Sequence, residues 1–355
     1  MRLHCATNAA DAKNNRLPRK PENKRMDNMN NRKKIVVLDG YTVNPGDISW
    51  ESVERLGDFT LYDRTKPEDT VRRAKDADIV LTNKVRMSAA VMEQLPKLKY
   101  VGLLSTGTDI IDINYCDEHG IVVCNIPAYS TGNVAQTVFA MILSICSPVE
   151  KYNVAVHEGR WVSSDDFCFQ DYPMSDMAGK TLGIIGYGKI GRKVADIARA
   201  FDMNVVIYSR TKRDDIPETE WRKTVYDVAK EADFLTIHCP LTDDTRGIVD
   251  KKFLRRMKKS AYLINTSRGG VLNESDVADA LNKGLIAGAC VDVLSTEPPK
   301  ADNPMLTAKN CLITPHIAWA GREARERLMD ICAGNLEGFL SGRTRNEVGK
   351  VKIGD

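Results

Sequence analysis

The sequence predicts an α/β protein with two domains, each built on a parallel β-sheet. Short runs rich in β-branched residues alternate with longer stretches of helical period, which is typical of βαβ units. The 355 residues, 43% of them apolar, are enough for two separate cores. A glycine-rich run at residues 183–191 begins a second set of strand-like runs, so the two sets are assigned to two domains.

The first set predicts a five-stranded, flavodoxin-like domain. Amphipathic segments such as residues 67–75 lie between its strands, and a last amphipathic helix at residues 322–340 crosses back to it. This domain is assigned to residues 33–132 and 318–355. Its strands are expected at residues 34–38, 59–62, 79–82, 100–104 and 121–124.

A long helix is expected between the two sets, at residues 134–154. Pro148 should kink or break it, because proline removes a helix hydrogen bond. The segment is more apolar than a lone exposed helix should be, so it indicates either ordinary core or a homodimer contact. Its apolar stretch at residues 134–145 is shorter than the roughly 20 residues that a bilayer crossing needs, so no membrane association is expected.

The second set predicts a doubly wound, Rossmann-like dinucleotide-binding domain at residues 133–317. Six strands that begin with a glycine-rich turn are typical of this fold. Its strands are expected at residues 182–185, 205–208, 234–238, 261–264, 287–291 and 312–314.

Three glycines stand between the first of these strands and a helix-like run at residues 193–201, which is the context that the dinucleotide motif requires. Gly186 permits a tight turn, and Gly188 lets backbone N–H groups approach a pyrophosphate. Gly191 lets the helix pack on the strand with its N-terminus toward the anion. The motif therefore predicts an NAD(P) cofactor.

The residues after the second strand of this domain favour NADP(H) over NAD(H). An NAD-selective domain places an acid there to bind the ribose 2′-hydroxyl. The chain instead has a basic run in which an Arg can hold a 2′-phosphate; the alternative is a solvated basic turn. The residues concerned are Ser209, Arg210, Thr211, Lys212 and Arg213.

The N-terminus is expected to be a disordered basic leader, residues 1–32. Residues 1–34 hold ten Lys or Arg against three acids, a local charge of +7 in a chain whose formal charge is +3. The leader has no apolar signal region, and Met26 or Met29 is an alternative start. A nucleic-acid-binding arm is the less favoured interpretation, because no aromatic residue interleaves the charges.

The nine cysteines occur singly, with no CxxC pair. Single cysteines in apolar runs behave as small hydrophobic residues, which fits a reducing cytoplasm. No His or Cys pair has ligand spacing, so no metal site is expected.

Three loops at predicted strand ends carry candidate chemistry, because ligand sites of open α/β sheets form at the carboxyl ends of strands. Arg268 can offer a planar guanidinium to a carboxylate; its alternative is a surface Arg in a glycine turn. A pair of Glu297 and His316 would supply a proton donor near neutral pH; a structural, hydrogen-bonded His is the alternative.

The order and wording of these loops resemble the D-isomer-specific 2-hydroxyacid dehydrogenase family over about residues 34–345. The resemblance implies that Arg268, Glu297 and His316 are catalytic, and that a hydride passes between nicotinamide and the 2-carbon of a 2-keto or 2-hydroxy acid. It also implies a homodimer.

The resemblance further implies the residues that surround the two ligands. Two loops would bind the substrate carboxylate through exposed backbone N–H groups: Asn83, Lys84 and Val85 in one, and Ser105, Thr106 and Gly107 in the other. Lys189 and Ile190 would follow the pyrophosphate. Thr106, Cys239, Pro240, Thr266 and Asp292 would border the cofactor, with Asp292 near the nicotinamide carboxamide.

Within the family, residues 38–46 and 316–319 are similar to the glycerate dehydrogenase or hydroxypyruvate reductase branch. This similarity implies hydroxypyruvate or glyoxylate as the substrate, and glycerate or glycolate as the product. A 3-phosphoglycerate dehydrogenase is one alternative. A non-catalytic, dinucleotide-sensing scaffold, like the transcriptional co-repressors that the family resembles, is another.

Overall fold

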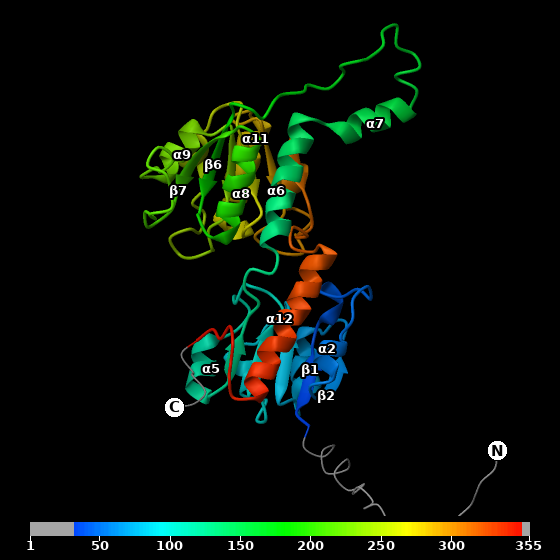
Figure 1. Cartoon of the computed structure of the whole chain (residues 1–355), viewed down its shortest axis with the longest axis vertical. Coiled ribbons are helices and arrows are strands. Elements are labelled where there is room, and N and C mark those ends of the chain that lie inside the picture. The colour runs from blue at the N-terminus through cyan, green and yellow to red at the C-terminus, as the bar shows by residue number, and fades with distance from the viewer. Residues whose placement is uncertain (1–31, 350–355) are drawn as a thin grey trace, which may run out of the picture.

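The computed structural model describes residues 32–349 and contains two lobes, each with one parallel sheet between helices (Figure 1). The predicted leader, apart from Arg32, lies outside the described residues, as do residues 350–355. The boundaries predicted between the two domains, at residues 132/133 and 317/318, stay a prediction.

The first lobe has the flavodoxin-like strand order that the sequence predicts, β2-β1-β3-β4-β5, with all strands parallel. Each predicted strand is confirmed, with its ends within one residue. The strands are β1 (Lys34–Val37), β2 (Asp58–Leu61), β3 (Ile79–Thr82), β4 (Tyr100–Leu103) and β5 (Val122–Cys124).

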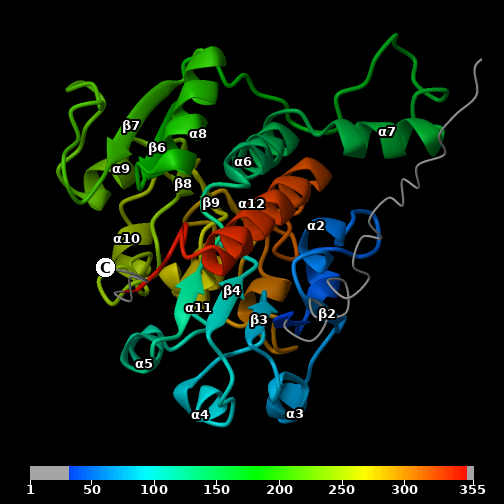
Figure 2. The same cartoon turned by 60° about the horizontal axis from the view of Figure 1, so that its bottom comes forward.

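Helices cover both faces of this sheet, which explains why its strands are nearly continuous apolar runs. Ile35 and Val37 contribute to the core under α2 and α12, whereas Val36 and Leu38 contribute to the core on the other face (Figure 2). The first lobe contains α2 (Glu51–Glu54), α3 (Thr70–Ala74), α4 (Ala89–Met92), α5 (Ile113–His119), α12 (Arg322–Leu340), η1 (Gly40–Thr42) and η2 (Pro67–Asp69).

The chain crosses between the lobes twice, and the two crossings meet. The first crossing leads into α6 (Thr131–Cys146) and the second leads into α12. The N–H of Gly321 donates to Oδ1 of Asn133 at 2.6 Å, and Nε of Arg327 donates to the carbonyl of Tyr129 at 3.0 Å. These bonds join the start of α12 to the start of α6.

The second lobe has a six-stranded parallel sheet in the order β11-β10-β9-β8-β6-β7. Trp221 forms a single parallel bridge with Ile207 of β7, at the edge of the sheet. Counting this bridge as a reduced third strand gives the order 3-2-1-4-5-6-7, which is the Rossmann order 3-2-1-4-5-6 with one further strand at its end. The strands are β6 (Thr181–Ile185), β7 (Asn204–Tyr208), β8 (Phe234–Ile237), β9 (Tyr262–Asn265), β10 (Gly288–Val291) and β11 (Cys311–Ile313).

This sheet also lies between two layers of helices. α6 and α8 pack on one face, and α9, α10 and α11 pack on the other. The bounds are α8 (Lys189–Ala200), α9 (Val225–Glu231), α10 (Lys251–Leu254), α11 (Glu274–Asn282), η3 (Gly269–Val271) and η4 (Pro304–Thr307).

The helix expected at residues 134–154 is broken at Pro148, as the sequence suggested. α6 ends at Cys146, and α7 (Val149–His157) continues at an angle of 55°. Within residues 32–349 no single helix is long and apolar enough to cross a membrane. The bent pair of α6 and α7 reaches the required length and apolar composition only when the two helices are taken together. α7 and residues 158–176, here called the arm, project away from the second lobe (Figure 1).

Candidate active site between the lobes

His316 and Glu297 form a hydrogen-bonded pair beyond the carboxyl ends of β10 and β11. Nδ1 of His316 lies 2.6 Å from Oε2 of Glu297. The other carboxylate oxygen accepts the N–H of Leu294 at 3.1 Å. Burial raises the pKa of Glu297, but the hydrogen bond and positive charge of His316 outweigh burial, so the pKa lies below its usual value. Glu297 is therefore ionised at neutral pH, and the second ring nitrogen of His316 is left for a ligand.

The backbone of His316 is held in an unusual conformation by Asp292. The φ angle of His316 is 55°, a left-handed conformation that costs a non-glycine residue energy. The carbonyl of Asp292 accepts the N–H of His316 at 2.8 Å. Its buried carboxylate accepts the N–H groups of Ile317 and Ala318, each at 2.9 Å. Asp292 therefore supports the His316 loop, while its expected contact with the nicotinamide stays a prediction.

Arg268 follows β9 in the second lobe and contacts the first lobe. Its Nε lies 3.3 Å from Oδ2 of Asp109, which follows β4, and its Nη1 donates to the carbonyl of Ser267 at 2.9 Å. A Cβ added to Gly107 would lie 2.2 Å from Nη2 of Arg268, so a larger residue here would push the guanidinium aside. The loop after β4 and the loop after β9 therefore meet between the lobes.

The expectation that residues 83–85 bind an anion through free backbone N–H groups is wrong, because Asp39 occupies those groups. Its carboxylate accepts from Asn83 N at 2.8 Å, from Lys84 N at 2.6 Å and from Val85 N at 3.2 Å. It also accepts the hydroxyl of Thr82 at 3.0 Å. Because β1 and β3 are neighbours in the sheet, the end of β1 delivers Asp39 to the loop after β3.

In the loop at residues 83–85, the side chain of Lys84, rather than the backbone, can contact a ligand. It remains accessible to water, yet desolvation between the lobes lowers its pKa, and the nearby carboxylate of Glu297 opposes only part of that effect. The charge of Arg268 lowers the same pKa further. Lys84 and Arg268 are thus two neighbouring cations, contributed by different lobes.

The loop at residues 105–108 does have available N–H groups. Its own polar side chains are used to shape it: Ser105 Oγ donates to the carbonyl of Gly107 at 2.9 Å, and Thr106 Oγ1 donates to that of Ile126 at 2.6 Å. Within the described part of the chain, the backbone N–H groups of Thr106, Gly107 and Thr108 have no protein acceptor. They lie on the loop that contacts Arg268, so a small anion would meet N–H groups and a guanidinium together.

The glycine-rich turn fits a dinucleotide. Gly186 has a φ of 100°, and a Cβ there would lie 2.7 Å from backbone atoms of His238 and Cys239. A Cβ on Gly191 would lie 2.2 Å from the carbonyl oxygen of Gly186, whereas Gly188 faces open space. No side chain caps α8, so the N–H groups of its first turn, which contains Lys189 and Ile190, are available to a phosphate.

The neighbouring loops support the same assignment. Thr266 is only 9% exposed, yet its hydroxyl has no hydrogen-bond partner among the described residues, as expected of a group that awaits a ligand. Cys239 and Pro240 follow β8 directly behind the turn at Gly186. The described residues therefore fit a dinucleotide here.

The basic run after β7 leaves Arg210 exposed. Lys212 forms an ion pair with Glu218, and Arg213 donates to the carbonyl of Tyr187 at 3.2 Å. Ser209 Oγ donates to the carbonyl of Thr211 at 2.6 Å, which closes the turn. Arg210 is thus the cation of this run with no partner assigned among residues 32–349.

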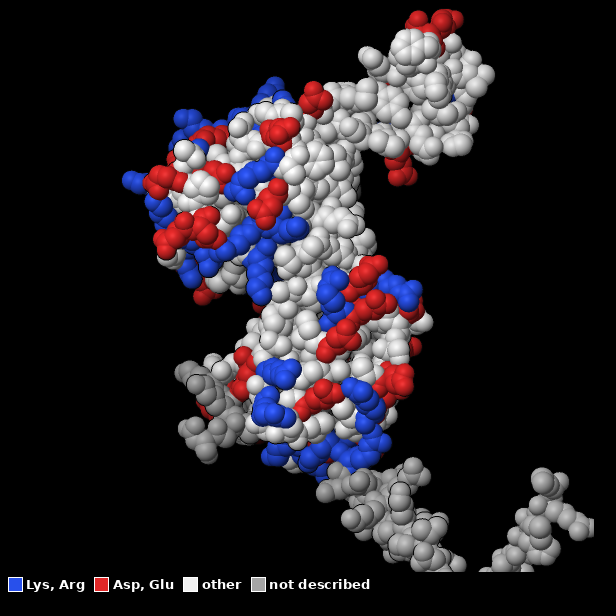
Figure 3. All heavy atoms as spheres, viewed as in Figure 1, with Lys and Arg blue, Asp and Glu red and all other residues white. Residues whose placement is uncertain are grey.

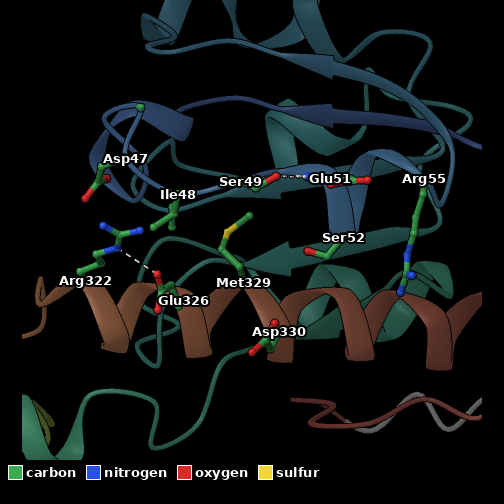
Figure 4. Close-up of a pocket in the computed structure, with 11 residues that line it drawn as sticks. Asp47, Ile48, Ser49, Glu51, Ser52, Arg55, Arg322, Glu326, Met329 and Asp330 are labelled. Carbon is green, nitrogen blue, oxygen red and sulfur yellow. Dashed lines mark hydrogen bonds and ion pairs between the residues drawn. The ribbon is translucent and has the colours of Figure 1, made fainter.

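A cavity of about 720 Å³ lies elsewhere, between residues 46–55 and α12 (Figure 4). Four acids and two arginines line it, and Arg322 pairs with Glu326 inside it at 3.0 Å. None of its lining residues belongs to the loops described above. The candidate site is therefore placed by the converging side chains rather than by this cavity.

Two residues of the site were not predicted from the sequence. Asp39 stands two residues after the end of β1, and Asp109 stands two residues beyond Gly107. A carboxylate directly after a predicted strand was an available signal for Asp39, since strand ends converge on the site. Asp109 had no comparable signal, because its partner lies 159 residues away.

Comparison with known proteins places this architecture in one family. A family model described as "D-isomer specific 2-hydroxyacid dehydrogenase, NAD binding domain" matches residues 139–318. The chain is 47% identical over 321 residues to a hydroxypyruvate reductase of Blautia hydrogenotrophica, covering 89% of this chain and all of the relative. It is 37% identical to a glycerate dehydrogenase of Methylorubrum extorquens, covering 89% of this chain and 99% of the relative.

Solved structures agree with the sequence relatives. An NADPH-dependent glyoxylate/hydroxypyruvate reductase from Sinorhizobium meliloti, in complex with NADP and malonate, has a TM-score of 0.78 at 26% identity over 91% of this chain and 99% of its own. An acyclic imino acid reductase with NADPH and D-Arg has the same TM-score at 30% identity over 89% of this chain and 99% of its own. The chain therefore belongs to the D-isomer-specific 2-hydroxyacid dehydrogenase family, in the branch of hydroxypyruvate reductases and glycerate dehydrogenases, and is an oxidoreductase that interconverts 2-keto and 2-hydroxy acids with a nicotinamide dinucleotide.

Proposed function

We propose that this enzyme reduces hydroxypyruvate to D-glycerate, and the smaller glyoxylate to glycolate, with NADPH as the preferred reductant. The observation that carries the proposal is that Lys84 feels the charges of both Arg268 and Glu297, and that Glu297 is bonded to His316. The hydroxypyruvate reductase that is 47% identical over its whole length supports the choice of substrate.

The chain's own groups would hold the substrate and move a proton. The guanidinium of Arg268 and the N–H groups of Thr106, Gly107 and Thr108 would bind the substrate carboxylate and polarise the 2-keto oxygen. Lys84 would add a second positive charge through its side chain. A bound nicotinamide supplies the hydride when the substrate is reduced.

His316 would act as the proton donor in reduction. Because Nδ1 is bonded to Glu297, Nε2 would carry the proton that passes to the keto oxygen. The ionised carboxylate of Glu297 stabilises the protonated ring and fixes its orientation. In oxidation, the same nitrogen would accept the proton of the substrate hydroxyl.

The preference for NADPH rests on the run after β7. Arg210 is exposed, and the neighbouring cations Lys212 and Arg213 already have partners. An Arg at this place can bind a 2′-phosphate, whereas no carboxylate of residues 209–213 is available for a ribose hydroxyl. The solved relative with bound NADP supports the proposal.

The arm supports a homodimer. Val162 and Phe167 are 92% and 89% exposed, and Trp161, Met174 and Val149 are also exposed. Clustered exposed apolar side chains mark interaction surfaces. Figure 3 shows few charged residues over α6 and the arm, in contrast to the mixed charges over the rest of both lobes. A surface with few charges that continues from α6 onto the arm fits a second copy of the chain.

A cytoplasmic location is also proposed. All eight cysteines among the described residues are free, and most of them are buried. Free thiols without disulfides are typical of a reducing compartment.

The test of function is a substrate panel. Purified protein would be mixed with hydroxypyruvate, glyoxylate, pyruvate or 3-phosphohydroxypyruvate, and the loss of reduced-nicotinamide absorbance would be followed with NADPH and with NADH. We expect the highest kcat/KM with hydroxypyruvate and NADPH, and loss of turnover in His316→Ala with NADPH binding unchanged. Highest activity with the phosphorylated acid would favour a 3-phosphoglycerate dehydrogenase. Dinucleotide binding without any turnover would favour the scaffold.

A further inference from the structure

The ion pair between Arg268 and Asp109 joins the two lobes at the candidate site. The other ion pairs described within residues 32–349 connect residues of one lobe. The pair also involves the guanidinium that the proposed function assigns to the substrate carboxylate. The carboxylate of Asp109 therefore occupies the guanidinium of Arg268, which is the group that the substrate carboxylate would bind.

We propose that Asp109 is a place-holder for the substrate: its carboxylate occupies Arg268 in the free enzyme, and the carboxylate of the 2-keto acid displaces it. This inference rests on the proposed function. It makes Asp109 a residue that sets the apparent affinity for the substrate by competing with it.

The ion pair between Arg268 and Asp109 has the geometry of a weak contact that another carboxylate can replace. One nitrogen meets one oxygen at 3.3 Å, and the side chains of Arg268 and Asp109 are 36% and 66% exposed. The pair between Arg325 and Asp47 in the first lobe is different, because two nitrogens meet two oxygens at 2.7 Å each. Bidentate pairs are the strong ones, and exposed single contacts are weak.

The loop around Asp109 explains why its carboxylate and the substrate carboxylate cannot both bind Arg268. On the segment that leads to Asp109, the N–H groups of Thr106, Gly107 and Thr108 have no acceptor among residues 32–349. A substrate carboxylate bound to these groups and to Arg268 would lie beside the carboxylate of Asp109, and like charges at close range repel. Asp109 is largely exposed, so its side chain can turn into solvent when the substrate arrives.

The size of the effect follows from the weakness of the pair. An exposed ion pair changes an equilibrium by about 1.4-fold to fivefold. A substrate that must first break such a pair binds more weakly by the same factor. Removing the charge of Asp109 should therefore tighten substrate binding by about 1.4-fold to fivefold.

The experiment uses the full-length enzyme and the variant Asp109→Asn, which keeps the shape of the side chain and removes its charge. Oxamate, an unreactive monoanionic analogue of a small 2-keto acid, would be titrated calorimetrically into enzyme saturated with reduced cofactor. KM and kcat for hydroxypyruvate would be measured in parallel. Asp112→Asn is the matched control: it removes the same charge three residues along, where the side chain only caps α5 by accepting from Tyr115 N at 3.1 Å, and Asn caps as well as Asp.

We expect Asp109→Asn to lower the Kd of oxamate and the KM of hydroxypyruvate by about 1.4-fold to fivefold, with kcat unchanged. Asp112→Asn should match the wild type. Weaker oxamate binding together with a lower kcat would show that Asp109 orients Arg268, and no change would show that it does neither; both results overturn the inference. If Arg268→Ala leaves oxamate binding unchanged, Arg268 does not bind the substrate carboxylate, and this part of the proposed function is wrong.

Discussion

The imidazole of His316 and the carboxylate of Glu297 meet at 2.6 Å, although 19 residues separate them in the chain. Separate backbone hydrogen bonds hold each of the two residues in place. Leu294 donates its N–H to Glu297, and Asp292 binds the backbone of the His316 loop. The His316 backbone stays in a left-handed conformation because these bonds restrain it. We therefore expect the ring of His316 to donate its proton in a fixed direction.

Replacing Glu297 with Gln should change the pH dependence of reduction. The pKa of Glu297 is lowered, so the group is a carboxylate at neutral pH and stabilises protonated His316. Gln keeps a hydrogen bond but has no charge, so the protonated imidazole loses its stabilising carboxylate. The alkaline fall in kcat for reduction should therefore move to lower pH, and kcat at neutral pH should fall by about tenfold to a hundredfold.

The profile of kcat against pH checks this prediction, with the exposed residue change Glu323→Gln as control. An unchanged alkaline limb in Glu297→Gln would mean that the carboxylate does not support the proton donor.

Replacing Arg210 with Ser should weaken NADPH selectively. The 2′-phosphate would lose its cation, so KM for NADPH should rise by about tenfold, while KM for NADH should stay within about twofold. Arg256→Ser removes the same charge from another exposed position of the second lobe and should have no effect. A lower KM for NADH than for NADPH in the wild type would contradict the proposed preference.

Replacing both Val162 and Phe167 with Ser should convert a dimer into a monomer. These side chains are almost fully exposed in the single chain, so in a dimer they would be buried against the partner. Light scattering coupled to size-exclusion chromatography measures the mass of the particle. Leu306→Ser, at another exposed apolar residue, is the control. A wild-type protein that stays monomeric at all concentrations would exclude this role of the arm.

Replacing Asp39 with Asn should destabilise the protein and disturb the loop that carries Lys84. An amide offers one acceptor where the carboxylate accepts from three N–H groups and a hydroxyl, so buried donors lose their partner. The free energy of unfolding in urea should fall by about 2–4 kcal/mol, and KM for hydroxypyruvate should rise.

Asp63→Asn, at an exposed position of the same lobe, should change stability by less than about 0.5 kcal/mol. If the two variants unfold at the same urea concentration, the bonds of Asp39 do not hold the loop.

Local pattern was enough to predict most of the framework. Strands buried on both faces need nearly continuous apolar runs, so all eleven strands were placed within one residue. Pro148 marked the break between α6 and α7 because its effect on a helix is local. The glycine turn at Gly186 was likewise predictable, since positive φ and close backbone approach both require glycine.

By itself, then, the sequence determined the two parallel sheets, the glycine turn and the loops that carry Arg268, Glu297 and His316. Only the tertiary structure decided which partners those loops meet. Asp39 reaches the N–H groups of the loop after β3 because β1 and β3 are adjacent, and Asp109 reaches Arg268 because the two lobes face each other. Neither contact has a sequence signature, because a hydrogen bond or ion pair between distant segments depends on how they pack in space and not on their spacing along the chain.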